Sequence, residues 1–172
     1  LEGDLFAPVA ARRFDLVLCN PPYVVSPAST FVYRDGPPGL CARIAREGPA
    51  HLAEGGVLQM ICHWPVRRGQ EAEATLRQWL EPSGCPTLVL KSASFPALDY
   101  AALWLGQQHE DEQAYARELE QWLAFYEREG IEAVGDGLVL LRPSGAGAPG
   151  FEVRPAPVLH GPAGDSLEAL LA

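Results

Sequence analysis

The stretch FDLVLCNPPY, residues 14–23, decides how this chain folds. An apolar run of strand length stops at two consecutive prolines, which lack backbone donors and fix two φ angles. The residue before each proline is pushed away from helical geometry, so the backbone around Asn20 is stiff and extended. A rigid loop at the carboxyl end of a strand in an α/β sheet is where ligands bind. The sequence therefore predicts a strand over residues 14–19, buried on both faces, with a binding loop directly after it.

The predicted loop offers hydrogen-bond acceptors and an aromatic face. The acceptors are the amide side chain of Asn20 and the free carbonyl of Pro21, and Tyr23 supplies the ring. Two acceptors and a ring suit a flat, conjugated amino group, which has two N–H donors and a plane to stack on. The alternative is that the double proline only ends a strand before a surface loop.

This run resembles the catalytic loop of class I methyltransferases that depend on S-adenosylmethionine. More narrowly, it is similar to the amino-methylating branch, which carries Asn or Asp, two prolines and an aromatic residue. That branch includes DNA adenine, ribosomal RNA guanine and release-factor glutamine methyltransferases. Two flanking stretches resemble the same family at matching distances: GDLF, residues 3–6, and LAEGGVL, residues 52–58. The resemblance covers roughly residues 1–142 and is weak beyond residue 143.

The resemblance implies a catalytic role for the four loop residues. Asn20 and the Pro21 carbonyl would each accept one N–H of the substrate nitrogen and aim its lone pair at the methyl group. Tyr23 would stack on the substrate plane, and Pro22 would shape the pocket wall. No strong general base is needed before the transfer, because the proton becomes more acidic once the nitrogen is methylated.

The resemblance also implies residues beside the cofactor, S-adenosylmethionine. An acidic residue placed like Asp4 contacts the adenine in the family, with Leu5 beside it, and Asn20 completes the set. Asp4 could equally be a turn residue next to Gly3. The family's glycine-rich cofactor loop has no counterpart before the Asn-Pro-Pro-Tyr run. We therefore expect a fragment, the C-terminal half of the catalytic domain, that is inactive alone.

The order of predicted elements is that of an α/β fold. After the first strand, helices are expected over residues 40–52, 68–80 and 110–129, and either a short helix or a strand over 99–107. A turn is expected at 54–56 and strands at 57–63, 86–92 and 133–142. By resemblance, these are strands four to seven of a Rossmann-like class I methyltransferase sheet, the last one antiparallel beside the fifth. The predicted division is a catalytic part over residues 1–142 and a Pro/Gly-rich, irregular tail over 143–172 that ends in a short helix.

Composition excludes several other classes of protein. The chain has 172 residues, and no apolar run of membrane-spanning length or signal peptide is visible, so we expect a cytoplasmic protein without a membrane partner. The four cysteines contain no Cys-x-x-Cys pair and are expected to be buried, reduced thiols. The histidines lack metal-ligand spacing, so no metal site is predicted, and His63 is expected to be packed or solvated.

The substrate stays open between a nucleic acid base, in RNA or DNA, and a glutamine side chain of a protein. A net charge of −9 leans towards protein, because phosphate contacts supply most nucleic-acid affinity. The larger number of nucleic-acid enzymes in the branch leans the other way. Two further hypotheses are a non-catalytic fragment that forms a homodimer through an open sheet edge at residues 14–19, and an acidic module that binds a basic partner.

Overall fold

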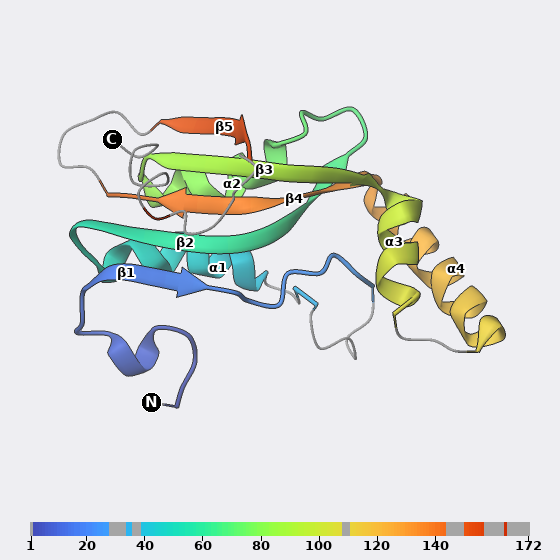
Figure 1. Ribbon diagram of the computed structural model, residues 1–172, viewed down its shortest axis with the longest axis horizontal. Helices are drawn as coiled ribbons and strands as arrows, with labels where there is room; N and C mark the ends of the chain where they lie inside the picture. The colour runs from blue at the N-terminus through green and yellow to red at the C-terminus, as the bar shows by residue number, and fades with distance from the viewer. Residues whose placement is uncertain are drawn as a thin grey trace.

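The computed structural model describes residues 2–27, 34–35, 39–107, 111–143, 150–156 and 164 as one mixed sheet with helices packed on it (Figure 1). The five strands stand in the order β1-β2-β4-β3-β5. The strands are β1 (Phe14–Cys19), β2 (Leu52–Arg67), β3 (Thr87–Pro96), β4 (Ile131–Leu141) and β5 (Phe151–Pro155). The helices are α1 (Leu40–Glu47), α2 (Ala74–Leu80), α3 (Ala97–Leu105) and α4 (Glu112–Glu129).

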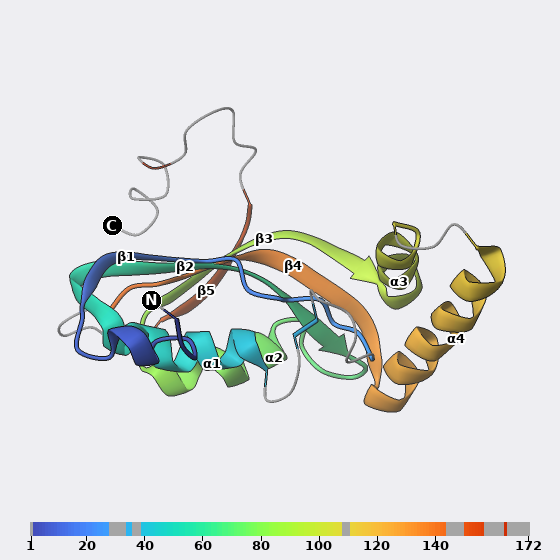
Figure 2. The ribbon, with the colours of Figure 1, turned by 90° about the horizontal axis from the view of Figure 1, so that it is seen from below.

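One strand runs against the others. β1 pairs with β2, and β3 with β5, in parallel, whereas β4 is antiparallel to both β2 and β3 and lies between them. The chain reaches β2 through α1 and β3 through α2, and both helices cover the same face of the sheet (Figure 2). The α3–α4 pair stands at one end of the sheet (Figure 1). This is the end at which β1 finishes and the Asn-Pro-Pro-Tyr loop begins.

The main core lies between the sheet and the α1–α2 face, and Trp64 of β2 is its largest fully buried side chain. The indole Nε1 donates a hydrogen bond to the Ala72 carbonyl at 3.0 Å. Directly opposite on β4 is Gly135, where an added Cβ would lie 2.3 Å from Trp64 Cε2. The missing side chain of this glycine therefore makes the space that the indole occupies.

A second core joins the α3–α4 pair to the rest of the chain. It contains Tyr100, Leu105 and Trp122 of the helices, Val134 of β4, and Val24 from the segment after the loop. α4 begins at an Asp111 cap whose carboxylate accepts from two backbone amides, and Gly130 ends it in a left-handed conformation. The aromatic face of this helix packs in the second core, against the chain that leaves β1.

The prediction that the first strand is buried on both faces is wrong for this chain. β1 is an edge strand of the sheet, and Leu16 and Leu18 are 51% and 67% exposed. Val17 and Cys19 point the other way and pack against the main core. The reason is that α1 and α2 both lie on one face (Figure 2), so the apolar run is covered on that side alone.

Several element boundaries differ from the predicted ones. The helix expected over 40–52 stops at Glu47, and a 3₁₀ turn, Gly48–His51, leads straight into β2. Residues 54–56, expected to form a turn, lie inside β2. There the pairing with β1 shifts register, between Phe14 and Leu16 of β1. The helix expected over 68–80 is shorter in the structure: α2 begins at Ala74 and ends at Leu80.

The expectation of an irregular tail is wrong at residues 151–155. This segment forms β5, which pairs with β3 from Thr87 to Lys91. Phe151 packs against the main core, and the Arg77 guanidinium lies 4.3 Å from the centre of its ring. The division at residue 142 stays a prediction, and the helix expected over 165–172 lies outside the described residues.

We expect the folded chain to protect its thiols from alkylation. Cys41 and Cys62 are fully buried, and this burial raises the pKa of both thiols far above the ordinary 9.0. Burial also raises the pKa of Cys19 and Cys85. Since only the thiolate reacts, labelling by iodoacetamide at pH 8 should be at least about tenfold slower for Cys41 and Cys62 than in urea. Mass spectrometry of timed samples measures this, and equal rates would contradict it.

The same shift makes stability depend on pH. Above about pH 9 the unfolded chain loses thiol protons that the folded chain keeps, so the unfolded state binds fewer protons. The free energy of unfolding should therefore fall as the pH rises through this range, and urea denaturation at pH 8 and pH 10 checks the sign. If the thiols reacted slowly with iodoacetamide but the free energy of unfolding did not fall between pH 8 and pH 10, their protection would come from slow access of the reagent and not from a raised pKa.

Candidate active site

The Asn-Pro-Pro-Tyr loop follows β1 without a break and leaves two acceptors open. Asn20 is exposed and Pro21 is buried. Within the described part of the chain, no group donates a hydrogen bond to the Asn20 side chain or to the Pro21 carbonyl. The Pro22 carbonyl instead accepts a weak bond from the Cys41 thiol at 3.9 Å. The two oxygens that the sequence predicts as acceptors thus have no hydrogen-bond donor among the described residues.

Two buried tyrosines of the α3–α4 pair fix the backbone just after the loop. The Val25 amide donates to the Tyr100 hydroxyl at 3.3 Å, and the Val25 carbonyl accepts from the Tyr126 hydroxyl at 2.8 Å. Burial raises the pKa of both tyrosines well above its usual range, so both hydroxyls keep their protons. Both polar groups of Val25 are therefore held by elements far away in the sequence.

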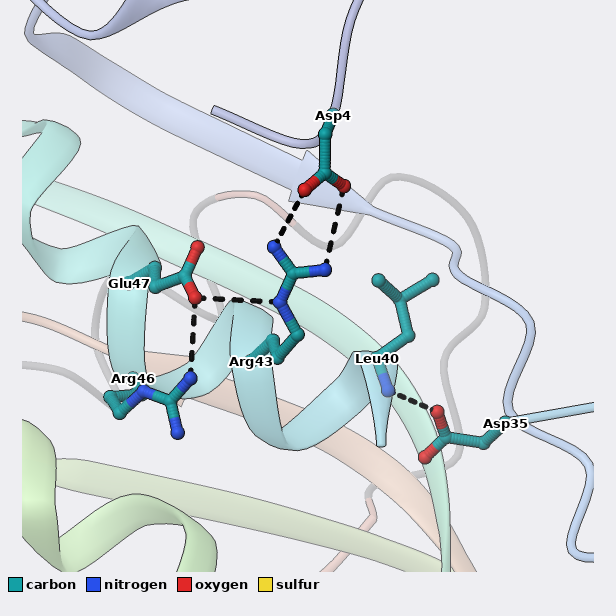
Figure 3. A network of polar contacts seen from close by, with 6 residues as sticks. All are labelled: Asp4, Asp35, Leu40, Arg43, Arg46 and Glu47. Atoms are coloured by element: carbon teal, nitrogen blue, oxygen red, sulfur yellow. Dashed lines mark hydrogen bonds and ion pairs between the residues drawn. The ribbon is translucent and has the colours of Figure 1, made fainter. Parts of the chain in front are cut away.

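Asp35 ties the returning chain to the start of α1. Its amide donates to the Val24 carbonyl at 3.1 Å. Its carboxylate accepts from the amide of Leu40 (Figure 3) and from that of Cys41, the first two residues of the helix. Burial raises the pKa of Asp35, and these two amide bonds oppose the rise. The loop is thus anchored to α1 as well as to α3 and α4.

Tyr23 lies half-buried in a group of rings that we call the aromatic cluster: Tyr23, His63, Tyr100 and Trp104. Its ring centre is 4.4 Å from that of His63, at an angle of 52°. Trp104 of α3 meets Tyr23 edge-on at 6.4 Å. One side of Tyr23 therefore rests on protein, which fixes the ring and limits any substrate stacking to the remaining surface.

His63 takes a larger part in the site than the sequence indicated. It was expected to be packed or solvated, and it is packed, with 8% of its surface exposed. In addition, Nδ1 lies 2.6 Å from the Tyr100 hydroxyl and Nε2 lies 3.3 Å from Asp136 Oδ1. The one available signal was the position of His63 on a strand that runs to the loop edge. Its partners could not be predicted from the sequence, because strand pairing and helix packing bring them next to His63.

The two residues predicted beside the cofactor occupy a turn before β1. Asp4 is exposed, and its carboxylate pairs with the Arg43 guanidinium of α1 at 2.9 and 3.4 Å (Figure 3). Its backbone carbonyl accepts from the Ala7 amide at 3.0 Å, as in a turn. Leu5 has a φ of 45°, in the left-handed region that few non-glycine residues adopt. Such an outlier is a reason to suspect a functional turn.

An apolar groove of about 370 Å³ joins this turn to the end of β1. Its lining runs from Leu5 and Phe6, along β1, to Cys19, with Ile44 of α1 as part of the wall. The groove therefore connects Leu5 with the residue that precedes Asn20, whereas Tyr23 packs into the aromatic cluster. Of the predicted cofactor residues, Leu5 alone lines this groove; Asp4 and Asn20 each adjoin a lining residue, and Tyr23 lies in the aromatic cluster instead.

Two further observations concern the described residues alone. No three His, Cys, Asp or Glu side chains there gather as a group that could hold a metal ion. None of the described helices is long and apolar enough to cross a membrane.

Part of the chain is similar in sequence to glutamine methyltransferases. It is 36% identical over 75 residues to the ribosomal protein uL3 glutamine methyltransferase of Xylella fastidiosa, a match over 36% of this chain and 23% of that protein. The same enzyme of Bradyrhizobium diazoefficiens is 37% identical over 83 residues, 41% of this chain and 25% of that protein. The chain thus spans about a quarter of the length of these relatives. The predicted resemblance to amino-methylating methyltransferases is confirmed for the matched part.

Other comparisons add little. No family model matches the chain. Among solved structures, the phosphoethanolamine N-methyltransferase 2 of Haemonchus contortus is similar at a TM-score of 0.36 and 12% identity, over 77% of this chain and 34% of that one. Because this similarity is low, the fold is described from the strand pairing of the chain itself.

Proposed function

We propose that this chain carries the catalytic loop of an S-adenosylmethionine-dependent N-methyltransferase that modifies the side-chain amide of a glutamine in a protein. One observation carries the proposal. The loop is anchored to α1, α3 and α4, and it leaves the Asn20 amide and the Pro21 carbonyl without hydrogen-bond donors among the described residues. The similarity to uL3 glutamine methyltransferases supports it independently.

The chemistry follows from the weakness of the nucleophile. The lone pair of an amide nitrogen is delocalised into its carbonyl and must be turned towards the methyl group. If Asn20 Oδ1 and the Pro21 carbonyl each accept one N–H, the nitrogen is held with its lone pair on the open side. As the nitrogen becomes positive in the transition state, both hydrogen bonds strengthen. Stabilisation of this kind, larger in the transition state than in the ground state, accelerates the reaction.

The groove along β1 is the proposed place for the cofactor, which supplies the methyl group when bound. Its apolar lining suits a flat adenosine, and it ends beside Asn20. Leu5 lines the groove, and Asp4 stands next to Leu5. The Asp4 carboxylate offers about four acceptor positions, so its pairing with Arg43 leaves room for a further donor.

The substrate is proposed to be a protein rather than a nucleic acid. The net charge of −9 opposes binding to a phosphate backbone and favours a basic protein surface. The relatives that match the chain are named for a glutamine of a ribosomal protein. A nucleic acid base remains the alternative acceptor, because its amino group has the same two donors and the same flat shape.

The test is methyl transfer from S-adenosylmethionine labelled in its methyl group. The acceptors are ribosomal protein uL3 of the host, deproteinised ribosomal RNA and duplex DNA, each offered to the chain as printed and to the complete product of its gene. We expect label in uL3 at a glutamine, found by peptide mass spectrometry. Asp4→Ala should raise KM for the cofactor about tenfold with kcat little changed. Label in RNA or DNA alone would overturn the choice of substrate, and label in none of the three would overturn the proposed function.

A second candidate is self-association without catalysis, and a specific observation favours it. β1 is an open edge with Leu16 and Leu18 exposed on one face, and such an edge can pair with a second copy. Sedimentation equilibrium at micromolar concentration separates the two candidates, since a monomer would count against the homodimer and leave the enzyme proposal intact.

A further inference from the structure

We propose that Asp136, His63 and Tyr100 form a positioning relay that holds the segment after the Asn-Pro-Pro-Tyr loop in place. The three residues come from β4, β2 and α3, and the relay ends on the amide of Val25, two residues after Tyr23. They are positioning residues, because the groups proposed to touch the substrate are Asn20 and the Pro21 carbonyl.

The two ends of the relay favour one direction for its contacts. A backbone amide only donates, so the Tyr100 oxygen accepts from Val25 at 3.3 Å. His63 Nε2 lies 3.3 Å from Asp136 Oδ1 in an ion-pair contact, and a carboxylate beside it favours hydrogen on Nε2. In the proposed arrangement the ring carries hydrogen on Nε2 alone, and Nδ1 accepts from the Tyr100 hydroxyl across 2.6 Å.

The sheet builds the first half of the relay. His63 and Asp136 are directly opposite each other on β2 and β4, so their side chains leave the same face of the sheet. The next pair along is Trp64 and Gly135, whose close fit leaves the two strands little freedom to slip in register. A one-residue slip would send the Asp136 side chain to the opposite face and break its contact with His63.

Packing of α3 builds the second half. Tyr100 is fully buried, so its hydroxyl would be costly to leave without partners. The His63 ring also packs against the Tyr23 ring, tilted by 52° with 4.4 Å between ring centres. One histidine thus supports the loop twice, through the ring of Tyr23 and through the backbone of Val25. Tyr126 holds the Val25 carbonyl from α4 and is separate from the relay.

The first measurement needs no variant. Nitrogen-15 NMR of the chain labelled on histidine reports which ring nitrogen of His63 carries hydrogen. We expect the Nε2–H tautomer with the neutral-ring shifts of a protonated Nε2 and an accepting Nδ1. A His63 ring with hydrogen on Nδ1 would overturn the relay, since Tyr100 would then have no acceptor in it.

The second measurement asks whether the relay holds the loop. Tyr100→Phe removes the hydroxyl and keeps the ring, and we expect exchange of the Val25 amide with deuterium to become at least about tenfold faster, the change expected for one lost hydrogen bond. Asp136→Asn is the matched control, because its amide oxygen can still accept from Nε2. Tyr126→Phe should leave the His63 tautomer unchanged. Should Tyr100→Phe fail to fold, Asp136→Ala takes its place, with loss of the tautomer preference expected. Unchanged exchange at Val25 in Tyr100→Phe, or an unchanged His63 tautomer in Asp136→Ala, would overturn the proposal.

The consequence for methyl transfer rests on the proposed function. There, Tyr100→Phe should lower kcat about tenfold and leave KM for the cofactor unchanged, because a loosened loop misplaces the acceptors and spares the groove. The NMR and exchange results judge the relay even if no substrate is ever methylated. A normal relay with an inactive enzyme would therefore count against the proposed function alone.

Discussion

Asn20→Ala is expected to lower kcat for methyl transfer by about 10²–10³-fold, the loss that follows removal of one preorganised transition-state hydrogen bond. Asn20 is exposed at the end of β1, and no group in the described chain bonds to its side chain. Its oxygen is therefore free to accept from the substrate nitrogen, where charge develops in the transition state. KM for the substrate should change much less, because the bond is stronger in the transition state than in the ground state.

The measurement is the labelled-methyl assay with steady-state kinetics for the complete gene product. Asn20→Asp is the matched control: it keeps an acceptor oxygen at the same place and should keep more activity than the alanine variant. Circular dichroism and urea denaturation of both variants should match the parent chain, since an exposed side chain contributes little to stability. If the alanine variant kept its kcat within about twofold, Asn20 would not be the acceptor and the assignment of the loop would be wrong.

Trp64→Ala should lower the free energy of unfolding by about 3–5 kcal/mol, the usual cost of removing a large aromatic side chain from a core. The indole is fully buried in the main core, and its removal also breaks the hydrogen bond to the Ala72 carbonyl. Gly135→Ala attacks the same contact from the other side. Its new Cβ would lie 2.3 Å from the indole, so the indole or the strands must shift, at an expected cost of about 1–3 kcal/mol.

Urea denaturation of the two single variants and the double variant tests this contact. The small side chain of Trp64→Ala gives the methyl group of Gly135→Ala room, so the double variant should be more stable than the sum of the single losses implies. Leu103→Ala on α3, a side chain that is 48% exposed, is the control and should change stability by less than about 1 kcal/mol. Strict additivity would show that the glycine and the indole do not share the space described here.

The α/β class and the loop were predictable because both depend on local patterns. The apolar run over residues 14–19 ends at two prolines, and that sequence is enough for a strand, a stop and a rigid loop that carries two acceptors. The long α4 helix was predictable for the same reason, since its aromatic spacing, its Asp111 cap and Gly130 lie within one segment. The resemblance to the family also rests on short motifs that the chain displays in order.

Features that depend on distant partners could not be predicted in this way. A proline- and glycine-rich tail predicts irregular structure, yet residues 151–155 form β5, because the edge of β3 offers backbone groups to pair with. The burial of β1 was overestimated because sequence alone does not say on which face α1 and α2 lie. Asp4 was expected to serve a cofactor, and the nearness of α1 gives it Arg43 as a partner as well.

By itself, then, the sequence determined the strand, the stiff loop and the chemistry that the loop can offer, because proline geometry and apolar patterning act over a few neighbouring residues. The tertiary structure alone decided what holds that loop. His63 meets Asp136 only because β2 and β4 pair in one register, and it meets Tyr100 only because α3 packs at the end of the sheet. Hydrogen bonds between segments far apart in the chain form only after folding brings their donors and acceptors together, and no local pattern records them.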